Sequence, residues 1–263
     1  MNNTNKFNGL ADVYAAGRPT YPNSFIDTLY SQYGFSEKTV IADVASGTGK
    51  FARLLLDRGS YVYCVEPNDD MRAQAAKELS GYSDVRIVNG TDAQTSLDDH
   101  SVDFVTVAQA FHWFDPAHFR KECVRILKSS GLVFLIWNLR DMQSELNQHN
   151  FSLFTRYCPN FKGFGGGIQR DDIRIRQFFE DGYTYKEFDH PLFYTAKEDF
   201  INRCLSGSYS LKEGDLEYSR YLEEISDLYD QYETDGSLLV PNKMAVYFGT
   251  WNAIRRNDEK RGI

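Results

Sequence analysis

The stretch VIADVASGTG, residues 40–49, decides the expected fold class. Its first five residues are apolar except for Asp43, as in a strand that is buried on both faces of a parallel sheet. Gly47 and Gly49 follow, and glycine permits the positive φ angles and close ligand approach of a tight turn. Apolar residues then recur at helical spacing over residues 48–57. The stretch therefore predicts a strand, a ligand-binding loop and a helix.

The same alternation of strand and helix patterns continues to residue 138. Further strands are expected over residues 61–66, 85–89, 102–107 and 132–137. Helices are expected over residues 68–79 and 114–127, the second capped by Asp115 with Pro116 at its first position. Strands that alternate with helices form parallel sheets, and ligands bind beyond the carboxyl ends of those strands. We therefore expect an α/β fold, a Rossmann-like and mostly parallel sheet with helices on both faces.

The alternation breaks after residue 138, which indicates three parts. Residues 1–138 form the ligand-binding core, residues 139–182 an inserted helical and loop cap or lid, and residues 183–263 a C-terminal completion of the sheet with a helical substrate-covering segment. Long insertions in enzymes are often lids, and a packing elaboration without a catalytic role is the alternative.

The third part contains two expected elements. Residues 214–233 predict an amphipathic helix whose inward residues are Leu222, Ile225, Tyr229 and Tyr232. Residues 245–251 predict a last strand, antiparallel in the sheet.

The composition argues against several kinds of partner. Lys and Arg number 29 and Asp and Glu 37, so the formal net charge is −8 and nucleic-acid phosphates are repelled. No apolar run approaches the ~20 residues of a membrane span, and the first residues do not read as a signal peptide. The 4 cysteines and 5 histidines show no metal-ligand spacing, which predicts free thiols and no metal. We expect a cytoplasmic monomer or homodimer with no membrane and no nucleic-acid partner.

Two carboxylates narrow the choice of ligand. In dinucleotide enzymes the glycine loop receives a pyrophosphate at the helix N-terminus, and Asp43 would repel that anion. A ligand that carries positive charge suits Asp43 better. Glu66 ends the second strand, where a carboxylate can accept both ribose hydroxyls of an adenosine cofactor. The segment GTGKFA at residues 47–52 also matches the loose dinucleotide pattern, so an NAD-dependent oxidoreductase stays open.

The chain resembles the class I S-adenosylmethionine-dependent methyltransferases. It is most similar to their small-molecule branch, methyltransferase type 11, with the trans-aconitate methyltransferase-like and ubiquinone/menaquinone-type enzymes. The resemblance covers about residues 14–138 and rests on YAAGRPTYP (14–22), the loop 43–49, Glu66, Asp92-Ala93, AQAFHWFD (108–115) and RILKSSG (125–131). One departure is Ala45, which stands where the family loop usually has its first glycine.

The resemblance implies a seven-stranded sheet and a set of cofactor contacts. Arg18, helped by Tyr14, would pair with the carboxylate of the cofactor, and Glu66 would hold its ribose. Asn68 and Met71 would flank the adenine. The full implied set is Tyr14, Arg18, Asp43, Ala45, Gly47, Gly49, Glu66, Pro67, Asn68, Met71, Asp92, Ala93, Gln109, Ala110 and Phe111. The cofactor would be S-adenosylmethionine and the product S-adenosylhomocysteine.

The acceptor is expected to be a small molecule that is methylated on oxygen, nitrogen or carbon. His112 is the candidate general base, with a packing role against the cofactor as its alternative. The candidate acceptor contacts are Trp113, Trp137, Asn138 and Arg140. Trp113 is favoured as a pocket wall or core residue over a chemical participant, and for Arg140 a surface ion pair is an equal alternative. A non-catalytic binding module and a nucleic-acid methyltransferase are the other readings; the second lacks an Asn-Pro-Pro-Tyr segment.

Overall fold

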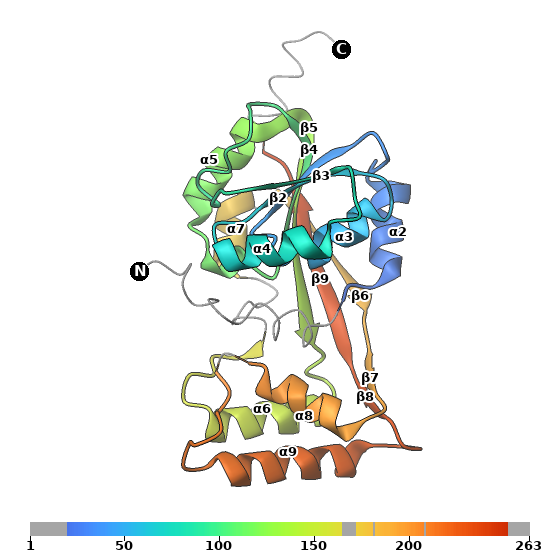
Figure 1. Ribbon diagram of the computed structural model, residues 1–263, viewed down its shortest axis with the longest axis vertical. Helices are drawn as coiled ribbons and strands as arrows, with labels where there is room; N and C mark the ends of the chain where they lie inside the picture. The colour runs from blue at the N-terminus through green and yellow to red at the C-terminus, as the bar shows by residue number, and fades with distance from the viewer. Residues whose placement is uncertain (1–19, 165–171, 181, 208, 252–263) are drawn as a thin grey trace.

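A computed structural model describes residues 20–164, 172–180, 182–207 and 209–251. A seven-stranded sheet in the order β3-β2-β1-β4-β5-β9-β6 lies at its centre (Figure 1). The strands are β1 (Val40–Val44), β2 (Tyr61–Val65), β3 (Val85–Val88), β4 (Val102–Ala108), β5 (Leu127–Arg140), β6 (Tyr183–Asp189) and β9 (Asn242–Gly249). Strands β1 to β5 pair in parallel, and β9 runs antiparallel between β5 and β6. The expected mostly parallel, seven-stranded α/β fold is confirmed.

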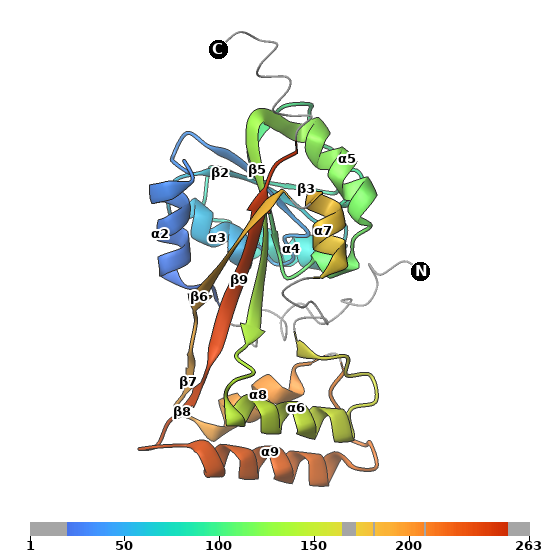
Figure 2. The ribbon, with the colours of Figure 1, turned by 180° about the vertical axis from the view of Figure 1, so that it is seen from behind.

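Helices cover both faces of this sheet (Figure 2). Helices α2 (Asn23–Gln32) and α3 (Lys50–Leu56) bury apolar residues against one face. Helices α5 (Pro116–Ile126) and α7 (Ile173–Phe179) do so against the other face. Helix α4 (Asp69–Glu78) connects β2 to β3. The strand order switches between β1 and β4: the strands that follow β1 are added on one side of it, up to β3, and then on the other side, from β4. Ligands bind at this switch point in open α/β sheets.

Local sequence signals place most elements within two residues of their expected ends. The start of α5 is as expected, because the Asp115 side chain accepts hydrogen bonds from the backbone N–H groups of Ala117 and His118 and Pro116 opens the helix. Strand β5 differs, since it begins at Leu127 rather than at residue 132. Residues 127–131, which precede the expected strand, are part of β5. The pairing register between β4 and β5 shifts between Val102 and Phe104.

A second lobe lies beyond the sheet and has its own apolar core (Figures 1 and 2). It consists of α6 (Glu145–Tyr157), α8 (Lys197–Leu205), α9 (Tyr218–Tyr232) and the antiparallel pair of strands β7 (Leu192–Tyr194) and β8 (Leu238–Val240). We call this lobe the cap. Helix α9 packs against both α6 and α8. Its buried residues are Tyr221, Ile225, Leu228 and Tyr229, so Leu222 and Tyr232, expected inward, are only half-buried.

Residues 139–182, expected as a cap or lid, are divided between the two lobes. Helix α6 lies in the cap, whereas α7 packs on α5 against the sheet, because Ile175, Phe178 and Phe179 join the core around β4 and β5. The rest of the cap comes from residues 192–240, within the C-terminal part that was expected to contain a helical covering segment. The cap is therefore assembled from two distant segments, and strands β5 and β9 connect it to the sheet (Figure 2).

The structure adds three observations on the composition. All four cysteines are free and buried. Within the described ranges, no helix combines the length and the apolar character needed to cross a membrane. In the same residues, no three His, Cys, Asp or Glu side chains are placed to hold a metal ion.

The position of α7 gives a stability prediction. The Phe178 ring is fully buried, 5.1 Å from the ring centre of Phe111 and 5.0 Å from that of Trp251. We expect Phe178→Ala to lower the free energy of unfolding by about 3–5 kcal/mol, measured by urea denaturation. Ile173→Ala on the same helix is the control, since its side chain is 61% exposed. Equal small losses in both variants would mean that α7 is not part of the core.

Candidate active site

The loop between β1 and α3 turns through three residues with positive φ. These are Ala45 at 56°, Gly47 at 57° and Gly49 at 80°. The φ angle of Gly49 and the position of its missing Cβ, 2.6 Å from Cδ1 of Leu79, both favour glycine at this N-cap of α3. A Cβ at Gly47 would meet no atom within 4 Å, so this backbone faces open space. The loop is shaped for a ligand to approach the chain closely.

Ala45 occupies the position of the usual family glycine in a left-handed conformation. Residues other than glycine enter this region at a cost of about 1–3 kcal/mol. Ala45 adopts this conformation nonetheless, so the alanine in place of glycine does not change the turn of the loop.

Asp43 of β1 is buried beside this loop. Its side chain is 1% exposed, and one carboxylate oxygen, Oδ1, accepts a hydrogen bond of 2.8 Å from the Thr106 hydroxyl of β4. The other oxygen, Oδ2, is buried without a hydrogen-bond partner. Burial raises the pKa of Asp43 to about 7, against the hydrogen bond from Thr106, which lowers it. A buried acceptor without a donor points to a missing ligand or proton.

Glu66 lies at the end of β2 and connects two loops. Its carboxylate accepts hydrogen bonds from the backbone N–H of Gly47 at 3.0 Å and from that of Asn68 at 2.9 Å. Burial raises its pKa, and these two bonds and Arg72 act in the opposite direction. Each carboxylate oxygen has further lone pairs, so Glu66 can still accept from a ligand hydroxyl. The sequence did not reveal this second role of Glu66 as a clamp.

Three further candidates, Pro67, Asn68 and Met71, lie in the turn after β2 and in the first turn of α4. Asn68 caps α4 by accepting a 3.0 Å hydrogen bond from the backbone N–H of Met71. Met71 is buried and Pro67 is half-buried. The turn is thus held rigidly by its own side chains, next to Glu66.

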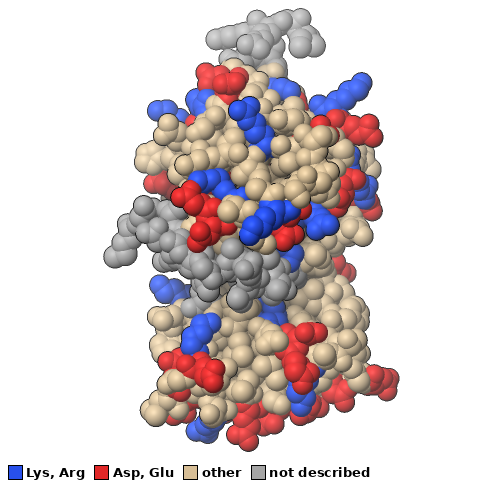
Figure 3. All heavy atoms as spheres, in the orientation of Figure 1, with Lys and Arg blue, Asp and Glu red and all other residues tan. Residues whose placement is uncertain are grey.

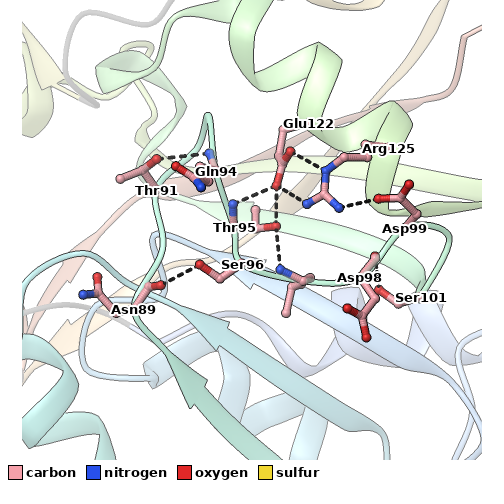
Figure 4. A network of polar contacts seen from close by, with 11 residues as sticks. Asn89, Thr91, Gln94, Thr95, Ser96, Asp98, Asp99, Ser101, Glu122 and Arg125 are labelled. Carbon is pink, nitrogen blue, oxygen red and sulfur yellow. Dashed lines mark hydrogen bonds and ion pairs between the residues drawn. The ribbon is translucent and has the colours of Figure 1, made fainter.

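The loop after β3 contains Asp92 and Ala93. Asp92 is half-buried, and burial raises its pKa, whereas Ala93 is exposed. This loop is anchored further along by Glu122 of α5, whose carboxylate accepts from both the backbone N–H and the hydroxyl of Thr95, at 2.7 Å and 2.6 Å (Figure 4). Arg125 donates to the same carboxylate and to Asp99. The network fixes the path of the loop that presents Asp92.

The segment after β4 places three candidates at the switch in strand order. Gln109 has a φ of 62°, and its N–H donates to the Ile136 carbonyl at 2.8 Å. Ala110 and Phe111 are buried. The Phe111 ring lies 6.2 Å from the ring centre of Trp137, inside the core on the α5 side of the sheet. Trp137, a candidate acceptor contact, has its ring buried in that core, and its indole N–H has no hydrogen-bond partner among the described residues.

The remaining candidates lie nearer to the surface. The half-buried His112 ring is 4.7 Å from the ring centre of Trp113, which is 45% exposed. Asn138 donates to the Thr20 carbonyl at 3.1 Å. The Arg140 guanidinium lies 5.4 Å from the ring centre of Phe164 and forms no ion pair with any of the described residues. Tyr14 and Arg18 lie outside the described residues.

Sequence reasoning missed Thr106, Thr95 and Glu122. Thr106 had a usable signal, because it is a polar residue in an apolar buried strand, and its register partner is Asp43. Thr95 and Glu122 gave no such signal, since they are 27 positions apart.

The Glu122 network predicts an acid-sensitive structure. Burial raises the pKa of Glu122, but hydrogen bonds from Arg125 and Thr95 outweigh burial and hold it below the ordinary value. The stabilisation is therefore present above the unfolded-state pKa of about 4.3 and is lost as pH falls through the lower folded pKa. We expect Glu122→Gln to lower the free energy of unfolding by about 1–3 kcal/mol at pH 7 and by less at pH 3, measured by urea denaturation. A loss that is independent of pH would contradict this account.

Residues 42–135 match the family model described as a methyltransferase domain. An uncharacterized methyltransferase of Mycobacterium bovis is 38% identical over 139 residues, which cover 51% of this chain and 53% of that protein. An uncharacterized methyltransferase of Schizosaccharomyces pombe is 29% identical over 192 residues, which cover 72% of this chain and 71% of that protein. The chain spans about half the length of the mycobacterial relative that it matches.

Solved structures agree on the fold. The YcgJ protein of Bacillus subtilis superposes with a TM-score of 0.54 at 15% identity, over 88% of this chain and 99% of that one. A candidate methyltransferase of Bacillus halodurans has a TM-score of 0.56 at 18% identity, over 86% and 97%. Residues 42–135 are therefore similar to a methyltransferase domain, and the fold of the chain is similar to that of the two solved structures.

Proposed function

We propose that this chain binds S-adenosylmethionine beyond the carboxyl ends of β1 and β2 and transfers its methyl group to a small organic acceptor. The observation that carries the proposal is the pair of buried carboxylates, Asp43 and Glu66, beside a glycine loop with open backbone. The acceptor atom is oxygen, nitrogen or carbon.

The residues at this end of the sheet fit the cofactor. The free Oδ2 of Asp43 suits the ammonium and sulfonium charges of the methionine part. Glu66 retains acceptor capacity for the ribose hydroxyls, and the open face of Gly47 lets the methionine part lie against the backbone. Met71, in the first turn of α4, and Asp92, in the loop after β3, would border the adenine.

An NAD-dependent oxidoreductase is disfavoured by the same carboxylates. A pyrophosphate at the N-terminus of α3 would lie close to buried Asp43, and its negative charge would disfavour the ionised carboxylate. Nucleic-acid methylation is disfavoured by charge. On the face drawn in Figure 3, the described Lys and Arg residues are interspersed with Asp and Glu and form no basic stripe.

When bound, S-adenosylmethionine supplies an electrophilic methyl group on a positively charged sulfur. The protein must hold the acceptor in line with that methyl group, and orientation of this kind contributes about 7–11 kcal/mol in well-placed reactions. Gln109 and Ala110 would border the transfer position, and Trp113 and Asn138 the acceptor. Half-buried His112 would act as a general base and remove a proton from the methyl acceptor.

Cofactor binding provides the direct test. We expect titration calorimetry to show binding of S-adenosylmethionine and S-adenosylhomocysteine and none of NAD. The dissociation constants should fall by up to about tenfold per pH unit from pH 5.5 to 7 and level off above, because the pKa of Asp43 is raised to about 7 and the carboxylate must lose its proton to attract the ammonium.

Asp43→Asn is the matched variant, and its affinity should be weaker and flat over the same pH range. Binding of NAD alone would remove the proposal. An identical pH profile in the wild type and in Asp43→Asn would remove Asp43 from the cofactor site.

His112 is tested by separating catalysis from binding. We expect His112→Gln to lower kcat by about 10²–10⁴-fold for an acceptor with a hydroxyl or amine, while the affinity for S-adenosylhomocysteine stays unchanged. His118→Gln is the control, because its side chain is 71% exposed on α5. A kcat that stays within about threefold of the wild type would make His112 a wall residue, with catalysis resting on orientation alone.

A further inference from the structure

Arg140 is the last residue of β5, at the junction of sheet and cap (Figure 2). Its Nη1 atom is buried and has no hydrogen-bond partner. The neighbouring acid, Asp141, pairs instead with Lys243 at 3.7 Å. The Arg140 guanidinium lies 5.4 Å from the ring centre of Phe164. Among the described residues, this partly buried cation has no counterion within ion-pair distance.

A second guanidinium approaches the same place from the cap. Arg203 of α8 donates to the Ser206 hydroxyl at 3.2 Å and lies close to the Tyr194 hydroxyl of β7. Arg140 and Arg203 are both close enough to Tyr194 and to Cys204 to lower the pKa of each. Burial outweighs them, so both pKa values are raised. The two cations therefore face one shared patch.

This arrangement is costly without an anion. Two like charges in a partly buried setting repel each other more strongly than in water, and buried charges are normally paired. A guanidinium presents a planar fork of donors that matches carboxylate and phosphate oxygens. An oxyanion between the two arginines would offset the repulsion and satisfy the free Nη1.

The patch lies at a useful distance from the reaction centre. The last residue of β4, Ala108, pairs with Ile136, and Arg140 lies four residues further along β5. That separation is about 13 Å along the strand. An acceptor that spans it would have its anionic end at Arg140 and its reacting atom near Gln109.

We propose that Arg140, Arg203 and the Tyr194 hydroxyl form an oxyanion subsite, and that the acceptor is a small molecule with a carboxylate or phosphate group. This inference rests on the proposed function, and it assigns the substrate class and a role for the cap. The cap would then contribute to acceptor specificity, and β5 would connect the subsite to the transfer position.

The test uses three probes of equal chain length: hexanoate, hexyl phosphate and the neutral hexanamide. Binding to the protein saturated with S-adenosylhomocysteine is followed by ligand-observed NMR at probe concentrations up to about 10 mM. A dissociation constant of that size corresponds to a binding free energy of about −2.7 kcal/mol. We expect at least one oxyanion to bind and hexanamide to bind at least tenfold more weakly. The stronger of the two oxyanions identifies the carboxylate or the phosphate as the natural group.

Variants connect the binding to the two arginines. Arg140→Gln and Arg203→Gln should each weaken oxyanion binding at least tenfold, and Arg140→Lys should give an intermediate loss, because it keeps the charge without the fork. Arg156→Gln is the control, since that arginine pairs with Glu224 on the cap surface at 2.8 Å. It should leave binding unchanged.

The affinity for S-adenosylhomocysteine is measured in every variant and separates the two proposals. Unchanged affinity shows that the variant is folded, so a selective loss of oxyanion binding supports the subsite. If wild-type protein binds no S-adenosylhomocysteine, the proposed function fails whatever the oxyanions do. Equal binding of hexanamide, no binding of either oxyanion, or wild-type binding in Arg140→Gln and Arg203→Gln overturns the subsite.

Discussion

The Glu66 carboxylate holds together the part of the molecule on which the candidate site depends. One oxygen accepts from Gly47 in the loop after β1, and the other accepts from Asn68 at the start of α4. A buried carboxylate is tolerated only where hydrogen bonds replace its lost water. Neither loop can move away from Glu66 without leaving that charge unsatisfied. The glycine loop and the turn after β2 therefore form one rigid unit, on which an adenosine ligand can be positioned.

Asp43 lies beside this unit in the opposite condition. Thr106 satisfies one of its oxygens and nothing satisfies the other, so burial leaves the pKa of Asp43 near 7. Arg140 shows a similar imbalance at the last residue of β5. Proteins satisfy most buried polar groups, and exceptions concentrate at functional sites. Among the buried polar atoms without a partner, these two mark the ends of the site that we propose, with the cofactor at Asp43 and the acceptor at Arg140.

Strand β5 runs from the sheet to the proposed acceptor end of the site. Its 14 residues pair with β4 inside the sheet and then, with β9, extend past it toward the cap. The cap has its own buried core, so it can be a stable lobe while it contributes Tyr194 and Arg203 to the junction. One lobe thus carries the cofactor residues, and the junction with the other carries the proposed acceptor contacts.

The sequence by itself determined the local elements. The strand, glycine loop and helix of residues 40–56 and the Asp115 cap of α5 follow from apolar periodicity and from hydrogen bonds between near neighbours, so they could be predicted with the sheet class. Only the tertiary structure decided the pairing of Asp43 with Thr106, 63 positions away, and of Glu122 with Thr95, 27 positions away. It also assigned α7 to the sheet and built the cap from two distant segments. The reason is that periodicity reports which face of an element is apolar, whereas the partner of that face depends on how the whole chain packs.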